Sequence, residues 1–159
     1  MSPAGTPASA RVIEAFGWAG LAIEVREHAT PTRTAEEAAA ACGCPIGAIV
    51  KSLVFAVRDT GEPRLLLVSG ANRVDEAAVA GETGEALVRP DAKAVRAWTG
   101  FAIGGIPPLG HTTALPTFLD RDLLDHARVW AAAGTPTSVF AIAPRDLVGA
   151  TGATIIRVA

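Results

Sequence analysis

The sequence predicts an α+β fold in which a curved, mixed and mostly antiparallel sheet, or partial barrel, is flanked by helices. Several short apolar runs are separated by turn residues, which is typical of strands joined by hairpins. Segments with helical spacing of apolar residues stand between these runs. The chain has 159 residues, half of them hydrophobic, so it is long enough for one core. We expect a flexible N-terminus over residues 1–7 and a single domain over residues 8–159.

The first third of the chain predicts a helix, a strand and a second helix. Apolar residues at helical spacing indicate the first helix over residues 8–19. Apolar residues alternate with polar or small ones over residues 21–27, which indicates a strand. The capping box Thr34–Glu37 opens an alanine-rich run, and a helix is expected there, ending at Gly43.

The next elements form a hairpin. The clearest strand is IVKSLVFAV, residues 49–57, and the turn Asp59–Pro63 leads into a returning strand over residues 64–70. Short helices are predicted over residues 74–80 and 91–98. Further strands are predicted over residues 115–120, 127–133, 137–143 and 153–159. The sequence leaves the order of the strands open.

Charge and composition narrow the classes of function. The net charge is −2, so the chain lacks the basic surplus that gripping a long nucleic acid requires. A nucleic-acid ligand is therefore expected to be touched locally, at roughly one to three phosphates. No apolar run is long enough for a bilayer and the N-terminus lacks a secretory pattern, so we expect a cytoplasmic protein without membrane contact. Cys42 and Cys44 are too close for a disulfide, and we expect reduced thiols, no metal and no cofactor.

Lys51 is the first candidate functional residue. Side chains alternate along a strand, so Lys51 shares its face with four apolar residues: Ile49, Leu53, Phe55 and Val57. An unpaired ammonium group in such a setting costs several kcal/mol. The lysine can pair with a carboxylate, extend into water from the strand end, or point into a cleft where an anionic ligand is its partner. The strand alone leaves all three open.

The second candidate is the loop FAIGGIPPLGH, residues 101–111. Gly104 and Gly105 lack a Cβ, so a ligand can approach their N–H groups, and Pro107 and Pro108 stiffen the rest of the loop. Neighbouring N–H groups of this kind can bind a carbonyl oxygen or an oxyanion. The glycine spacing differs from that of phosphate-binding and dinucleotide motifs. The alternative is a rigid connection between two strands.

Taken together, these segments resemble a known family. The strand IVKSLVF, the turn SGANRVDE at 69–76, TGFAIGGIPPLGH at 99–111 and LPTFLD at 115–120 occur in the order typical of YbaK/ProX aminoacyl-tRNA deacylases. These enzymes are related to the editing domain of bacterial prolyl-tRNA synthetases, and the resemblance runs from about Ile23 to the C-terminus. It implies the curved mixed sheet of that family. It also implies hydrolysis, in trans, of the ester between a wrong small amino acid, such as Cys or Ala, and the tRNA 3′-terminal adenosine.

The resemblance also assigns site residues and partners. Lys51 matches the family's essential lysine, and Gly104 and Gly105 match its Gly-Gly segment, so these three are expected to be catalytic. The expected partners are the aminoacyl-tRNA 3′ end and, as a candidate, an aminoacyl-tRNA synthetase; oligomeric state is left open. His111 matches a histidine of some branches and either orients water or is a structural hydrogen-bonder. The residues expected to bind substrate are His28, Thr30, Ser69, Asn72, Ile103, Ile106, Gly110 and His111. For Asn72 the alternative is a role in the turn, and for His28 and Thr30 it is an ordinary surface position.

Some positions depart from the family pattern, and two other functions compete. The chain has no Tyr, Arg26 stands where some members place an aromatic residue, and Ala133–Gly134 stands where Cys-specific members tend to have Gly-Gly. The specificity of a particular member therefore does not transfer. One alternative is a non-catalytic tRNA- or synthetase-binding module of the same fold. Another is a small-molecule hydrolase or lyase in which Lys51 forms a Schiff base.

Overall fold

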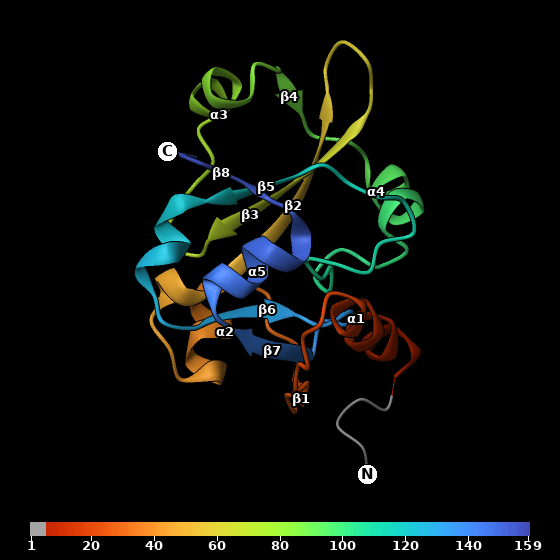
Figure 1. Cartoon of the computed structure of the whole chain (residues 1–159), viewed down its shortest axis with the longest axis vertical. Coiled ribbons are helices and arrows are strands. Elements are labelled where there is room, and N and C mark those ends of the chain that lie inside the picture. Colours follow the sequence, from red (N-terminus) through yellow and green to blue (C-terminus); the bar gives the residue numbers. More distant parts are fainter. Residues whose placement is uncertain (1–5) are drawn as a thin grey trace.

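The computed structural model describes residues 6–159 of the chain (Figure 1). Its helices within this range are α1 (Pro7–Trp18), α2 (Ala35–Cys42), α3 (Glu76–Thr83), α4 (Ala92–Thr99) and α5 (Pro144–Thr151). Its strands are β1 (Arg26–Glu27), β2 (Val50–Val57), β3 (Pro63–Ser69), β4 (Leu87–Val88), β5 (Thr117–Asp120), β6 (Val129–Ala132), β7 (Ser138–Ile142) and β8 (Thr154–Ile156). Two short 3₁₀ turns, η1 (Ile46–Ala48) and η2 (Arg121–Asp125), complete the secondary structure. None of these helices combines the length and the hydropathy that crossing a membrane requires.

The strands form two sheets that meet at one bridge. The larger has the order β4-β2-β3-β5-β8, with parallel pairing of β3 with β5 and of β5 with β8. The smaller has the order β1-β7-β6 and is antiparallel. A parallel bridge between Ile49 and Trp130 connects β2 to β6. The predicted α+β class with a curled, mixed and mostly antiparallel half-barrel is confirmed.

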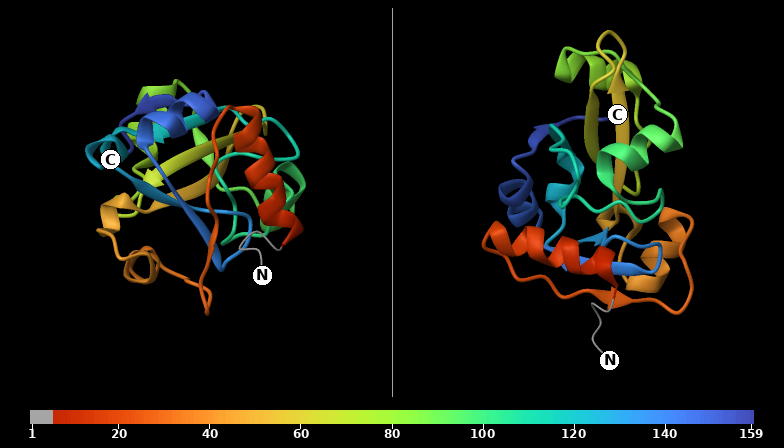
Figure 2. Two further views of the ribbon diagram at one scale, coloured as in Figure 1. Left: turned by 60° about the horizontal axis from the view of Figure 1, so that its bottom comes forward. Right: turned by 90° about the vertical axis from the view of Figure 1, so that its right-hand side faces the viewer.

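Helix α1 and strand β3 show why the sequence folds this way. The rings of Phe16 in α1 and Phe140 in β7 pack edge to face, with centroids 5.1 Å apart, so the helix covers the smaller sheet. In β3, Leu65 and Leu66 are both fully buried, in two different core clusters. The strand is therefore buried on both faces, which explains its continuous apolar run. Figure 2 shows α1 at the end of the molecule opposite the tip of the β2–β3 hairpin.

Most predicted elements are present, with two informative differences. The predicted start and end of α2 are confirmed, because the Thr34 hydroxyl accepts a hydrogen bond from the Glu37 N–H at 3.1 Å and Gly43 ends the helix with a φ of 68°. The Glu37 carboxylate accepts from the Arg33 N–H at 2.7 Å, one residue before the Thr34 N–H that a capping box uses. The strand expected over residues 21–27 is reduced to β1, whose two residues alone pair with β7. Helix α5 was not predicted, although Pro144 and Asp146 in its first turn and Gly152 after its end are signals for the start and end of a helix. Its eight residues with an internal glycine are too short a run for apolar spacing to show the helix between those signals.

The loose end expected over residues 1–7 lies mostly outside the described residues. Thr6 and Pro7 belong to the start of α1, where the Thr6 hydroxyl accepts a hydrogen bond from the Ser9 N–H at 3.0 Å. This contact satisfies one of the free N–H groups at the start of the helix.

Candidate active site

A cavity of about 300 Å³, which we call the lysine cavity, opens between β2, the start of α2, the loop 101–111 and the β6–β7 hairpin. Lys51 and Ser52 line it from β2, and Ile103, Gly104 and Ile106 line it from the loop. The structure thus brings together the strand lysine and the glycine loop, which are far apart in the chain. In the larger sheet, β4 pairs with β2 only at Ala56 and Val57, near the end of β2. Within residues 6–159, the first residues of β2 have no strand paired on that side, and they border the cavity.

The ammonium group of Lys51 is held by a carbonyl group. Its Nζ donates a hydrogen bond to the main-chain oxygen of Asn72 at 2.5 Å. Over residues 6–159, no carboxylate lies within 4.0 Å of it. Burial lowers the pKa of Lys51, the charge of Arg73 lowers it further, and Asp120 and Glu36 oppose the shift. An ammonium group has three N–H donors, so two remain for a ligand in the cavity.

Asp120 fixes the carbonyl that holds the lysine. Its carboxylate is 1% exposed and accepts hydrogen bonds from the Ser69 N–H at 3.0 Å and the Asn72 side-chain amide at 2.8 Å. The Asp122 N–H donates to it at 3.0 Å as well. The parallel pairing of β5 with β3 places Asp120 beside the end of β3, where this turn begins. Ser69 and Asn72, expected to bind substrate, therefore lie behind Lys51, and Ser69 donates its own hydroxyl to the Gly47 carbonyl at 2.8 Å.

The two glycines of the loop are needed for different reasons. The Gly105 N–H donates to the Ala102 carbonyl at 3.1 Å, which closes a turn with Gly104 at its third position. Gly104 has a φ of 98°, the left-handed conformation that this position of a type II turn requires. Gly105 packs against backbone instead, because a Cβ there would lie 2.7 Å from the Thr135 Cα. Among the described residues, the N–H of Gly104 has no main-chain acceptor.

Gly110 and His111 lie away from the lysine cavity. They line a separate hollow next to α1. The His111 ring N–H donates to the Pro107 carbonyl at 2.7 Å, and the Arg11 guanidinium donates to the Gly110 carbonyl at 3.0 Å. Burial lowers the pKa of His111, the Pro107 contact opposes this, and the Arg11 charge adds to it. These residues fasten the loop to the body of the protein from behind.

His28 and Thr30 are also outside the cavity lining. His28 approaches it indirectly, with its Nε2 3.8 Å from the sulfur of Cys42, which does line the cavity. Thr30 is exposed on the segment before α2. Of the residues expected to bind substrate, Ile103 and Ile106 are the two that line the cavity.

The cavity thiol is not a nucleophile near neutral pH. Burial and the neighbouring Cys44 raise the pKa of Cys42 to about 11, while Arg26 opposes the shift, so the group remains a thiol. Within residues 6–159, His, Cys, Asp and Glu side chains form no group of three or more suited to hold a metal ion.

Hydroxyl groups in the cavity were missed by the sequence analysis. The buried Ser52 Oγ has no hydrogen-bond partner among the described residues. Thr135 and Ser138, from the β6–β7 turn, bond to one another through their hydroxyls at 2.7 Å. Two signals were available: Ser52 directly follows the lysine, and TPTS at 135–138 concentrates three hydroxyls between two strands.

A mixed half-barrel with a lysine and a glycine turn in one cavity defines a domain of the tRNA-editing type. The model of the aminoacyl-tRNA editing domain family matches residues 29–150, and the chain belongs to this family. The resemblance inferred from the sequence is thereby confirmed.

Three relatives show how far the similarity extends. The uncharacterized protein YwhH of Bacillus subtilis (strain 168) is 30% identical over 125 residues, which are 78% of each chain. A solved structure described as a "putative trans-editing enzyme for prolyl tRNA synthetase" is 45% identical, with a TM-score of 0.89 over 96% of each chain. The hypothetical protein APE2540 is 30% identical, with a TM-score of 0.85 over 93% of this chain and 98% of that one.

Proposed function

We propose that this protein hydrolyses, in trans, the ester bond of a tRNA charged with a wrong small amino acid, such as cysteine or alanine. The observation that carries the proposal is the shared cavity: Lys51, with two unused N–H donors, and the free N–H of Gly104 line the same space. Its volume of about 300 Å³ is at the small end of ligand sites, which suits a small aminoacyl group and the sugar that carries it.

The residues support hydrolysis without a covalent intermediate. An aminoacyl ester is already activated, so water, oriented by the free ribose hydroxyl of the substrate, attacks the carbonyl carbon. The Gly104 N–H donates to the oxyanion that forms, and Gly105 keeps the turn packed on Thr135 so that this donor is fixed. Lys51 neutralises the terminal phosphate and positions the adenosine. The ester C–O bond then breaks and the ribose oxygen takes up one proton of the attacking water. The amino acid is released as a carboxylate, and the second proton of the water passes to solvent.

Selection by size follows from the same cavity. One methylene changes pocket binding by about 1–3 kcal/mol, so a synthetase discriminates poorly against amino acids smaller than its own. A second pocket that admits only the smaller ones corrects the error. Ile103, 61% exposed at the cavity, and the buried Ile106 are the apolar residues we assign to this exclusion. The net charge of −2 indicates a weak grip on the tRNA body, so a synthetase is a suitable partner.

The lowered pKa of Lys51 also favours a second candidate function. A lysine with a lowered pKa is the kind that forms Schiff bases with carbonyl substrates, as a lyase would use. Borohydride treatment with a panel of small aldehydes and ketones separates the two functions. A trapped adduct at Lys51 would support the lyase, and no adduct together with deacylation of tRNA would exclude it.

The chain offers a matched control for the decisive experiment, because Lys51 and Lys93 are its only lysines. Wild type, Lys51→Ala and Lys93→Ala are incubated with tRNAs carrying Cys, Ala, Ser, Thr or Pro, and loss of the ester is followed. We expect Lys51→Ala to lower kcat/KM on the preferred tRNA by roughly 100-fold or more, as for other lost charge-stabilising donors. Lys93 is exposed on α4, and its replacement is expected to change nothing. Equal rates of wild type and Lys51→Ala on every tRNA would contradict the proposal.

A further inference from the structure

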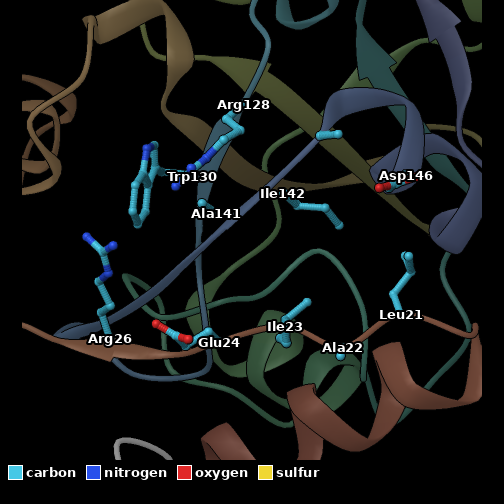
Figure 3. Close-up of a pocket in the computed structure, with 11 residues that line it drawn as sticks. Leu21, Ala22, Ile23, Glu24, Arg26, Arg128, Trp130, Ala141, Ile142 and Asp146 are labelled. Atoms are coloured by element: carbon cyan, nitrogen blue, oxygen red, sulfur yellow. The ribbon is translucent and has the colours of Figure 1, made fainter.

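Two arginines flank one tryptophan on the outer face of the smaller sheet. The guanidinium carbons of Arg26 and Arg128 lie 5.0 Å and 5.6 Å from the centre of the Trp130 ring. Figure 3 shows the three side chains gathered at one end of a hollow of about 460 Å³, which we call the arginine hollow. Arg128 directly precedes β6 and stands two positions before Trp130, so extended backbone puts the two side chains on the same face, and Arg26 reaches that face from β1.

Both guanidinium groups are available for an anion. Over residues 6–159, neither has a carboxylate within 4.0 Å, whereas Arg64 is paired with Glu85 at 3.0 Å. Both arginines are exposed, and the indole beneath them is 8% exposed, so the ring is a fixed support. Stacking on an indole orients a guanidinium and leaves its N–H fork free, the geometry that matches phosphate oxygens.

The acidic groups of the hollow do not neutralise the two arginines by forming ion pairs with them. Asp146 lies at the opposite end of the hollow from the arginines, and Glu24 lies beside Arg26 without forming an ion pair (Figure 3). A polyanion that lies across the two exposed guanidinium groups at this end of the hollow avoids Asp146.

The arginine hollow adjoins the lysine cavity. Trp130 is the one described residue that lines both spaces, and its bridge partner Ile49 stands two positions before Lys51. A strand of nucleic acid whose last nucleotide occupies the lysine cavity must continue out of it. Arg26 and Arg128 lie over Trp130, on the side of this residue that borders the arginine hollow. A strand that leaves the cavity past Trp130 brings its preceding phosphates to these two arginines.

We propose that Arg26 and Arg128 bind the phosphates of the single-stranded tRNA 3′ end, just before the nucleotide that carries the amino acid. The inference rests on the proposed editing function and names the surface that function uses. It also explains how a chain with a net charge of −2 binds a nucleic acid: two guanidinium groups bind phosphates locally, although the chain as a whole has no basic surplus.

The test compares two substrates that carry the same amino acid. One is the charged tRNA, and the other is the aminoacyl ester of adenosine, which has no phosphate. The variants are the double replacement Arg26→Gln/Arg128→Gln and the control Arg89→Gln. Arg89 is also exposed and stacked, 5.5 Å from the Phe55 ring, but it follows β4 at the far edge of the larger sheet. Binding of uncharged tRNA is measured in parallel by fluorescence anisotropy over a series of salt concentrations.

We expect the double variant to lose roughly 10-fold or more in kcat/KM on the tRNA while hydrolysing the adenosine ester at the wild-type rate. The slope of log K against log salt for uncharged tRNA should fall by about 1.4, since each contact with a single strand contributes about 0.7. Arg89→Gln should match wild type in every assay. The inference would be overturned by a double variant that keeps the wild-type kcat/KM on tRNA and the wild-type salt slope. It would also be overturned by one whose kcat/KM falls equally on the tRNA and on the adenosine ester. If wild type cleaves neither substrate, the editing function fails, and the salt slope for uncharged tRNA still decides whether this surface binds phosphate.

Discussion

Replacing Gly105 by Ala tests whether the position of the glycine turn controls activity. The backbone of Gly105 does not have a positive φ, so alanine fits its conformation without strain. The added methyl meets the Thr135 backbone, with contacts of 2.7 Å to Cα and C and 2.8 Å to N. These are backbone atoms, so no side-chain rotation relieves the contact. Since ordinary contact begins near 3.4 Å, the loop and the β6–β7 turn must separate by about 0.7 Å.

The size of the effect can be worked out from this displacement. Forcing one extra methyl into a close-packed contact costs about 2 kcal/mol of stability. For a chain of 159 residues this lowers Tm by about 4–8 °C, so the protein remains folded at 25 °C. The Gly104 N–H moves with the loop, and a misplacement approaching 1 Å costs up to about 100-fold in rate. We expect kcat on the preferred charged tRNA to fall by roughly 10- to 100-fold.

Gly152→Ala provides the control for lost stability. Gly152 ends α5 with a φ of 66°, it has open space around a Cβ, and it does not line the lysine cavity. Its replacement costs about 1–2 kcal/mol through backbone strain alone. Both variants are assayed by thermal unfolding and by deacylation at 25 °C. If Gly105→Ala lost no more activity than Gly152→Ala at a similar Tm, the fixed position of the turn would be irrelevant to catalysis.

Three further outcomes are expected. Asp120→Asn turns an acceptor of buried N–H groups into a donor, so stability should fall by about 1–3 kcal/mol in urea unfolding, and kcat should fall through the loosened Asn72 carbonyl; unchanged kinetics would remove its positioning role. Cys42→Ala should retain activity, and iodoacetamide should label Cys42 slowly at pH 7, because its pKa of about 11 leaves little thiolate; fast labelling would contradict this. Burial places the folded pKa of His111 below 6.5, so the stability present above pH 6.5 should be lost as the pH falls through that lower pKa. His111→Gln should flatten the dependence of Tm on pH from 7.5 to 5, and equally steep curves would refute the assignment.

The helices and strands were predictable where one local signal decides the conformation. Thr34 and Gly43 bound α2 because a cap and a left-handed glycine act within a few residues. The prediction of a strand over residues 21–27 was too long, because a strand forms only where a neighbouring strand pairs with it. In this segment only Arg26 and Glu27 pair with β7. The order of the strands was open for the same reason, since the parallel neighbours of β5 are distant in sequence.

The same distinction applies to the residues of the candidate site. Lys51 and Gly104 were recognisable because an ammonium group in an apolar strand and a glycine pair in a turn are unusual in any fold. The part of Asp120 was not recognisable, because it acts on Lys51 through Asn72, and that chain of contacts exists only once β5 lies beside β3. The grouping of Trp130 with the two arginines was missed because Arg26 comes from β1 and the other two from the start of β6 and the residue before it, which only the folded sheet brings together.

Lys51 also links function to stability, and Lys51→Met measures the link. The pKa of Lys51 is lowered in the folded protein, so the unfolded chain holds the proton more tightly and the charged form opposes folding. Below the lowered pKa both states are protonated and the full penalty applies, so Lys51→Met should raise the free energy of unfolding there, while it lowers deacylation as Lys51→Ala does. As the pH rises through the lowered pKa toward the ordinary 10.5, the wild type loses the penalty and the difference should shrink. Urea unfolding of both proteins at pH 7 and pH 10 measures this, and a difference that stayed constant would show that the charge is not what destabilises the free protein. Under the proposed function, the two N–H donors that Lys51 does not use for the Asn72 carbonyl are taken up by an anionic substrate.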